Sequence, residues 1–361
     1  MTSSFQPSWV SAPGDTLEDA LEEQGLTQAQ LAERTGFSRK HVNDLIRGRA
    51  AINADTAMRL ESVVGGPAKF WLAREAQYRE ALARRARVEQ LREDAGWLKE
   101  LPVADIVRFG WAKRRSHRGE QVAECLRFFG VASAESWQEL WSEPLAAFRA
   151  SDKAAKKAGA VAAWLRAGER AASAQRCSDY DRSGFLAVLS ELRGLTNEPD
   201  PSVFVPEMQR LCSSVGVAVA FLPRPKGCPV SGATKWLTPT KAMLLLSLRY
   251  KTNDHLWFSF FHECGHIVKH GKRMLFLEGA DSISTEHEEE ADKFARDLLI
   301  PPAQARELAT LGYNKAAVRA FAAHIGVAPG IVVGRMQWEK LLPWTHLNDL
   351  KVRYEWTEAD E

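Results

Sequence analysis

The stretch His262-Glu263-Cys264-Gly265-His266 carries the residue types of a metal-dependent hydrolase. On an α-helix, side chains four residues apart lie on one face, so the imidazoles of His262 and His266 would project side by side. Two imidazoles at that spacing can occupy two corners of a tetrahedral zinc site, with Glu263 beside them as a candidate general base. The motif is short enough to arise by chance, so the assignment needs a third ligand and a suitable structural context.

The flanking residues predict a helix through this motif. The apolar run 242–250 is typical of a buried strand, and the polar segment 251–254 is typical of a turn in which Asp254 caps the following helix. Gly271 is expected to follow the end of that helix. The residues expected to pack its inner face are Leu256, Trp257, Phe260, Phe261 and Ile267.

The third ligand is expected on an acidic helix that begins near Thr285. Thr285 and Glu288 form the S/T-x-x-E pattern of a capping box, and Pro301 marks the end of the helix. Glu288 and Asp292 are four residues apart and share a face. Glu288 could therefore bind the metal while Asp292 accepts a hydrogen bond from a ligand histidine and fixes its tautomer. Glu290 remains an alternative third ligand.

These residues resemble the ImmA/IrrE-type zinc metallopeptidases. The resemblance rests on the 262–266 motif and on Glu-x-x-Ala-Asp-x-Phe-Ala-x-x-Leu-Leu-Ile-Pro at 288–301, and it covers residues 185–345. Members of that family look like zinc endopeptidases that cleave or inactivate a partner repressor, under stress or during mobile-element induction. The resemblance implies a gluzincin-like site in which His262, His266 and Glu288 hold zinc and Glu263 is the catalytic base.

The chemistry expected of such a site is peptide hydrolysis. Zinc with three protein ligands keeps a fourth position for water and lowers the pKa of that water toward neutrality. Glu263 would take the proton and later return it to the leaving amine. Cys264 stands where the family usually has a bulkier apolar residue and is interpreted as a packing thiol. His270 lies one turn too far along the helix to share the ion, so a supporting role is expected. Tyr250 could stabilise an oxyanion, but packing at the strand end is the preferred interpretation.

A second signal lies near the N-terminus. An acidic helix is expected over residues 16–24, and a second helix, opened by a T-x-x-Q capping box at Thr27, over residues 28–35. Gly36 permits a tight turn, and Ser38 caps a third helix. This order is typical of a helix-turn-helix, whose third helix lies in the major groove of DNA.

The stretch 14–78 resembles the HigA-type antitoxins of the Cro/repressor-like family, including Ala-Ile-Asn at 51–53 and Phe-Trp-Leu at 70–72. The resemblance implies a regulator, usually a homodimer, that binds a double-stranded DNA operator. It also implies a small toxin as a further partner. Base-edge contacts are predicted for the start of the third helix, and phosphate contacts for residues around it. The candidates are Arg39, Lys40 and Asn43 for the first group and Gln28, Arg47 and Arg49 for the second, and the capping residue Ser38 is a further DNA-binding candidate.

Formal charge does not by itself favour DNA binding. Residues 1–73 hold seven Lys/Arg and nine Asp/Glu, a net charge of −2. The segment 38–49 nevertheless holds four basic residues and one acidic residue, Asp44, so positive charge is concentrated on the predicted recognition helix. A helical protein-docking module that does not contact DNA is the alternative.

Composition places the chain among reduced, cytoplasmic proteins. Its 361 residues allow two or three domains, and a net charge of +2 indicates no strong global attraction to polyanions. The five cysteines include no Cys-x-x-Cys pair, which favours reduced thiols. Neither a signal peptide nor an apolar run of membrane-spanning length is present in the sequence, so no membrane association is expected.

The expected fold class is mainly α with a small β-sheet (α+β). The strands near the zinc helices are expected around 215–221 and 233–237, and one long helix is expected over 81–97. The predicted domains are a five-helix helix-turn-helix domain at 1–78, a helical connecting region at 79–190, a zincin-like metallopeptidase domain at 191–310 and a C-terminal helical subdomain at 311–361.

The last segment repeats the offsets of the helix-turn-helix at Ala322, Gly326 and Val332. Few basic residues lie nearby, so a helical cap on the peptidase is preferred to a second DNA-binding motif.

Two functions from different classes remain open. The first is a DNA-binding transcriptional regulator whose zinc endopeptidase cleaves a repressor- or antitoxin-type protein, or itself. The alternative is a non-proteolytic repressor or antitoxin of a HigA-like module, in which the zinc site is sensory or structural.

Overall fold

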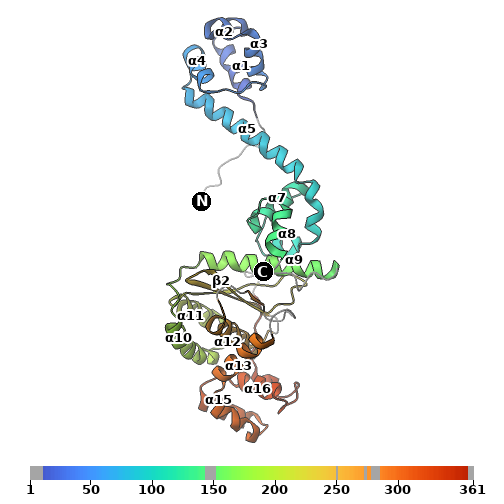
Figure 1. The fold of residues 1–361 in the computed structure, drawn as a ribbon, viewed down its shortest axis with the longest axis vertical. Helices are drawn as coiled ribbons and strands as arrows, with labels where there is room; N and C mark the ends of the chain where they lie inside the picture. The colour runs from blue at the N-terminus through green and yellow to red at the C-terminus, as the bar shows by residue number, and fades with distance from the viewer. Residues whose placement is uncertain (1–10, 143–151, 249–250, 272–274, 278–284, 357–361) are drawn as a thin grey trace. The chain divides into compact units, whose positions relative to one another are not determined.

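The computed structural model of the protein describes residues 11–142, 152–248, 251–271, 275–277 and 285–356. The chain forms two compact units, Met1–Glu93 with Arg118–Glu120 and Asp94–His117 with Gln121–Glu361. Helices dominate the described residues, and the strands form one small sheet in the second unit (Figure 1). The expected class, mainly α with a small β-sheet, is confirmed.

The first unit holds the five consecutive helices that the sequence predicts. Their bounds are α1 Pro13–Glu23, α2 Gln28–Thr35, α3 Arg39–Ile46, α4 Ala54–Val64 and α5 Ala68–Gln90.

α2 and α3 begin at the predicted capping residues. The Thr27 hydroxyl accepts a hydrogen bond from the backbone N–H of Gln30 at 3.2 Å, and the Gln30 side chain accepts one from the backbone N–H of Thr27 at 2.9 Å. The Ser38 hydroxyl accepts from the backbone N–H of His41 at 3.1 Å. Gly36 ends α2 with φ of 73°, a left-handed conformation that glycine adopts without strain. Both capping predictions are confirmed.

The apolar face of α3 fixes its orientation within this unit. Val42 and Leu45 are buried in a core with Leu17, Leu31 and Trp71 from the other helices. Because one face of α3 is committed to this core, its polar side chains are left on the opposite face, which is open to solvent.

The chain continues through shorter helical segments before a second long helix. Their bounds are η1 Glu93–Lys99, α6 Val103–Arg108, α7 Arg118–Phe129, α8 Ala134–Ser142 and α9 Asp152–Ala174. The expected single helix over 81–97 is wrong, since α5 starts earlier and ends at Gln90. Asp94 and Gly96, both poor helix formers, fall instead in the 3₁₀ segment η1.

The sheet has strand order β1-β3-β2-β4, in which β1 is parallel to β3 and β2 is antiparallel to both of its neighbours. The expected strands around 215–221, 233–237 and 242–250 are thus present, the last ending at Leu246. Bounds are α10 Arg182–Gly194, α11 Pro201–Ser213, β1 Val217–Phe221, β2 Gly232–Thr238, β3 Lys241–Leu246 and β4 Phe276–Leu277.

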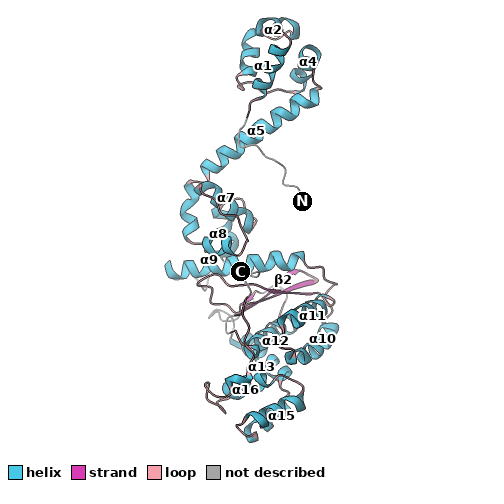
Figure 2. Cartoon of the chain, turned by 180° about the vertical axis from the view of Figure 1, so that it is seen from behind, coloured by secondary structure: helices cyan, strands magenta, loops and turns pink. Residues whose placement is uncertain are grey.

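Helices cover both faces of the sheet, with α9 on one and α12 (Asn253–Lys269) on the other (Figures 1 and 2). Leu245 of β3 packs against Gly168 of α9, whereas Leu244 belongs to the core cluster that includes Trp257 and Phe260 of α12. This two-sided burial explains why β3 is apolar throughout rather than alternating.

α12 and α13 (Thr285–Leu299) pack closely because of a single glycine. A Cβ atom built on Gly265 would lie 3.0 Å from Cα and 3.3 Å from Cβ of Ala291, closer than side chains normally approach. The small residues at these two positions therefore let the helix with the His-Glu-x-x-His motif approach the acidic helix.

The start of α12 differs from the prediction. Thr252 occupies the N-cap position without a side-chain cap, and Asp254 lies inside the first turn, so Asp254 is not the N-cap. Its carboxylate instead forms a buried ion pair with Lys351 at 2.6 Å. A partner far along the chain thus takes the carboxylate that local sequence assigns to the helix end. At the other end, α12 stops at Lys269 and Gly271 follows the C-cap residue His270.

The C-terminal helices pack onto this pair as a cap. Bounds are α14 Pro302–Ala305, η4 Arg306–Thr310, α15 Lys315–Ile325, α16 Pro329–Trp338 and η5 Asn348–Leu350. Gly326 has φ of 74°, close to that of Gly36, so the turn does repeat the N-terminal one. Val332, Val333 and Met336 of α16 are fully buried and α16 packs on α12, which agrees with a cap.

Among the described residues, no single helix is long and apolar enough to cross a membrane, and the one helix pair that qualifies jointly, Lys315–Ile325 with Pro329–Trp338, is bent by 109°.

The close contact between α12 and α13 gives a testable expectation. Gly265→Ala should lower the free energy of unfolding by about 1–3 kcal/mol, because its methyl group must push against the backbone of Ala291. Gly194→Ala is the control, since nothing lies within 4 Å of a Cβ built there. Thermal unfolding of both variants would measure the difference. Equal unfolding midpoints would contradict the proposed packing constraint.

Candidate metal centre

Two histidines of α12 and one glutamate of α13 converge on a common point. His262 Nε2 lies 3.0 Å from His266 Nε2 and 3.3 Å from Glu288 Oε2, and His266 Nε2 lies 3.4 Å from Glu288 Oε1. Both histidines are buried, and Glu288 is partly exposed. The structure thus brings together the three residues that the sequence proposes as ligands.

The spacing of these atoms suits a small divalent ion. Ligand bonds of about 2.0–2.2 Å in a tetrahedral site place neighbouring ligand atoms roughly 3.3–3.5 Å apart. The three observed separations, 3.0, 3.3 and 3.4 Å, approach that triangle. The donor set, two imidazoles and a carboxylate, also matches the chemistry of such an ion.

Asp292 fixes the tautomer of His262. Its Oδ1 lies 2.8 Å from His262 Nδ1, and a carboxylate accepts a hydrogen bond there, so Nδ1 carries the proton. The Nε2 atom of His262 then has a lone pair directed at the common point. Asp292 thus takes the position proposed for it beside the ligand.

A second chain of contacts, through His270, fixes the tautomer of His266. His270 Nε2 lies 3.1 Å from Glu290 Oε2, and His270 Nδ1 lies 2.9 Å from His266 Nδ1. If Nε2 of His270 donates to Glu290, its Nδ1 accepts from His266, which leaves Nε2 of His266 unprotonated. Glu290, the alternative ligand, therefore contacts His270 and is not part of the group formed by Glu288 and the two histidines.

The surroundings keep two of the donors in the form that binds a cation. Burial lowers the pKa of His266 below its usual value, even though the neighbouring Glu288 opposes this, so the imidazole stays neutral. Burial would raise the pKa of Glu288, but the two imidazoles, which donate hydrogen bonds to it when no cation is bound, outweigh burial and hold the pKa at about 2. Glu288 is therefore ionised at neutral pH.

Glu263, which follows His262 in α12, is fully buried and faces the sheet. Its Oε2 atom accepts a hydrogen bond of 2.5 Å from the hydroxyl of Thr234, a buried residue of β2. Sequence reasoning missed Thr234. The only available signal was a hydroxyl on an otherwise apolar, inward-facing strand position, opposite Leu244 in the register of β2 and β3.

Three further residues were expected at or near the site, and the structure describes the surroundings of one of them, Cys264. Tyr250 and the side chain of Thr285 fall outside the described residues, so the oxyanion role and the second capping box stay predictions. Cys264 is fully buried, and burial raises the pKa of its thiol well above the usual value, which agrees with packing.

The predicted DNA-contacting residues gather around the two helices of the turn. Arg39 and Lys40 are exposed in the first turn of α3, next to Ser38 at its N-cap, and Gln28 is exposed at the start of α2. Arg47, at the C-cap of α3, is exposed as well.

Two members of the predicted set are held by contacts within the unit. Arg49 forms an ion pair with Asp44 at 2.7 Å and donates a hydrogen bond to Asn43 Oδ1 at 2.9 Å. The side-chain oxygen of Asn43 is thus already used within the unit. Arg49 is less available for DNA than the other basic side chains, because it is paired with Asp44.

Comparison with known proteins assigns both parts of the chain. Residues 17–71 match a family model described as helix-turn-helix, and residues 215–337 match a peptidase-family model described as the IrrE N-terminal-like domain. The chain therefore carries a helix-turn-helix domain followed by an IrrE-like domain of a metallopeptidase family, as the two resemblances imply. This pairing fits a regulator with a protease domain.

Two individual proteins are similar over shorter stretches. Virulence-associated protein I of Dichelobacter nodosus is 37% identical over 67 residues, which make up 18% of this chain and 62% of that protein. The structure of an addiction module antidote protein of a HigA family from Coxiella burnetii shares 26% identity. That match covers 23% of this chain and 92% of the other, with a TM-score of 0.22.

The metal centre can be tested by titration. After treatment with a chelator, the chain should take up one divalent ion, and Glu288→Gln should weaken binding by more than the ~10–100-fold typical of losing a group that only supports a ligand. Glu290→Gln is the matched control and should cost less. Calorimetric titration and elemental analysis would measure both. A larger loss for Glu290→Gln would instead make Glu290 the third ligand.

Proposed function

We propose that the protein is a DNA-binding transcriptional regulator whose zinc-dependent endopeptidase domain cleaves a repressor- or antitoxin-type protein, or itself. The observation that carries the proposal is the convergence of His262, His266 and Glu288 on one point, with the buried Glu263 next to His262 in α12. The match of residues 215–337 to a peptidase family supports it independently.

Zinc is the ion that best suits the proposed site. Two neutral imidazoles and one carboxylate form a three-ligand set typical of catalytic zinc, and such sites keep one position open. When bound, zinc would polarise a peptide carbonyl and lower the pKa of water.

The chain's own residues would then move the proton. Glu263 would accept the proton of the attacking water and return it to the leaving amine, as a general base and then a general acid. The hydroxyl of Thr234 holds one oxygen of Glu263, so the other oxygen has a defined direction. Asp292 and His270 would keep the two ligand imidazoles in the tautomers that bind the metal.

The helix-turn-helix would bring this activity to DNA. Arg39 and Lys40, exposed at the start of α3, are proposed to contact base edges in the major groove, together with Asn43, and Ser38 at the N-cap is proposed to lie against the DNA beside them. Arg47, Gln28 and Arg49 would contact phosphates and set the register. A homodimer on a two-fold operator is the proposed assembly, and a small toxin is a further proposed partner.

Replacing the proposed base separates proteolysis from metal binding. Glu263→Gln should reduce peptide hydrolysis by about 10²–10⁴-fold while one zinc ion per chain is retained, because the ligands are untouched. Mass spectrometry of products from candidate repressor proteins, with wild type and variant side by side, would measure this. If the variant regulates its target genes as wild type does, the result contradicts the protease proposal and favours a sensory or structural zinc site.

The DNA contacts should divide into two kinds. Arg39→Ala should weaken the free energy of DNA binding by about 1–3 kcal/mol and relax specificity at one base position. Arg47→Ala should weaken binding to all sequences and lower the slope of log K against log salt concentration by about one. Lys69→Ala, an exposed change on α5, is the control. Binding to duplexes enriched from a random pool, measured by fluorescence anisotropy at several salt concentrations, would test this. No effect from either arginine would favour the protein-docking alternative.

A further inference from the structure

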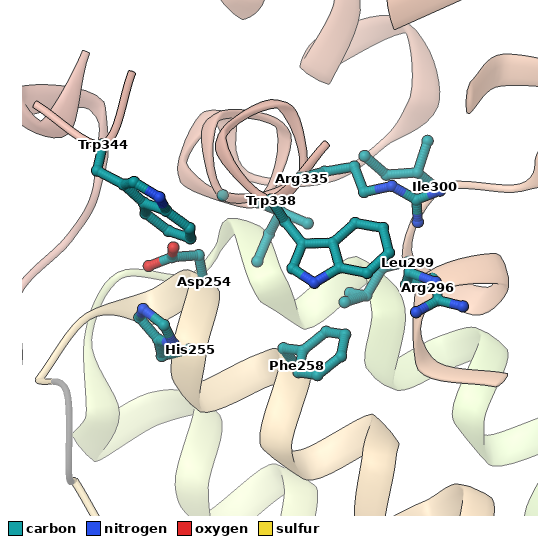
Figure 3. A pocket seen from close by; sticks show the side chains of 11 residues that line it. Asp254, His255, Phe258, Arg296, Leu299, Ile300, Arg335, Trp338 and Trp344 are labelled. Carbon is teal, nitrogen blue, oxygen red and sulfur yellow. The ribbon is translucent and has the colours of Figure 1, made fainter. Parts of the chain in front are cut away.

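A cavity of about 250 Å³ lies between α12, α13 and α16 (Figure 3). Phe258 of α12 and Trp338 of α16 lie on opposite sides of it, and Leu299, Ile331 and Trp344 complete its apolar wall. No sequence motif marks this cavity, and the proposed metal chemistry does not use it.

The cavity lies one helical turn from the metal ligands. Phe258 precedes His262 by four residues, about 6 Å along the helix axis, and the two rings are 6.2 Å apart. On α13, Arg296 follows Asp292 by four residues and lines the same cavity. The two helices thus carry the metal ligands at one end of their contact and the cavity at the other.

Size and openness suit a single side chain of a ligand. A cavity of ~150 Å³ is sufficient for benzene, so this volume admits a phenyl or indole ring with a few further atoms. Trp338 and Trp344 are 52% and 60% exposed, so the cavity is bordered by aromatic surface in contact with solvent. Tryptophan side chains left in this state are typical of binding surfaces.

A partly buried guanidinium, that of Arg335, makes one wall of the cavity polar. Arg335 Nε donates to Glu339 Oε1 at 2.6 Å, but its buried Nη1 has no hydrogen-bond partner among the described residues. Arg296 lies 4.6 Å over the Trp338 ring. A buried N–H without an acceptor is costly, so an incoming oxygen would be favoured at this place.

We propose that this cavity is a specificity pocket for the polypeptide substrate, which takes one aromatic side chain while Arg335 donates to a carbonyl or carboxylate oxygen of the same segment. This assignment rests on the proposed endopeptidase function. An extended peptide advances about 3.3 Å per residue, so a side chain one to three residues from the scissile bond would reach the pocket.

Cleavage specificity of the zinc-loaded full-length chain tests the proposal. In a mixture of random peptides, mapped by mass spectrometry, aromatic residues should be enriched at one fixed position relative to the cut. Trp338→Ala should reduce kcat/KM for such peptides by roughly ten- to hundredfold, while peptides with alanine at that position change little. Tyr313→Ala is the control, since Tyr313 is 59% exposed outside the pocket.

A binding measurement that needs no catalysis separates the two proposals. 3-Phenylpropanoate should bind the Glu263→Gln protein and shift the NMR signal of the Trp338 indole N–H, and 3-phenylpropanol should bind more weakly. Trp338→Ala and Arg335→Met should each reduce binding of the acid at least roughly tenfold, and Tyr313→Ala should not.

The outcomes are distinct. Cleavage without any side-chain preference, or with a preference that Trp338→Ala leaves intact, overturns the pocket and leaves the peptidase standing. If no peptide is cut, binding of the acid with the expected variant pattern supports the pocket alone. Failure of the acid to bind wild type and Glu263→Gln alike overturns the pocket.

Discussion

The contact between Gly265 and Ala291 is the constraint on which the candidate centre depends. It allows two helix backbones to approach so closely that three lone-pair donors from them lie within 3.0–3.4 Å of one another. Such a group is electrostatically unfavourable without a shared proton or cation, because its lone pairs face each other. Burial of the surrounding aromatic and aliphatic residues supplies the free energy that holds the group in place.

α13 supplies one candidate ligand and also the carboxylates that hold the two imidazoles. Glu288 joins the two imidazoles, Asp292 one turn later holds the first, and Glu290 reaches the second through His270. One helix therefore supplies the third donor and the carboxylates that set the protonation of each ring. A rotation of α13 about its axis would disturb all three contacts together, so the proposed metal site requires the close packing of α13 on α12.

The sequence predicted those features of the fold that depend on interactions between residues close together in the chain. The capping residues Thr27 and Ser38 fix where α2 and α3 begin, and the four-residue spacing of His262 and His266 places them on one face. Long-range partners escaped prediction for the same reason. Thr234 meets Glu263 only through the register of β2 with β3, and Asp254 meets Lys351 across the whole C-terminal cap. Nothing within a few residues of either carboxylate reveals these partners.

Exposure of the donors decides from which side a substrate can approach. His262 and His266 are 2% and 1% exposed, and Glu263 is closed off by β2, whereas Glu288 and Asp292 of α13 are 28% and 37% exposed. The solvent-accessible side of the group is therefore the side of α13. The cavity that Phe258 and Trp338 enclose is bordered by the C-terminal end of the same helix. A polypeptide substrate of the proposed peptidase that reaches the candidate ligands along α13 would thus meet the aromatic cavity within a few residues. Its selectivity would depend on that cavity, because the buried centre itself offers little surface for recognition.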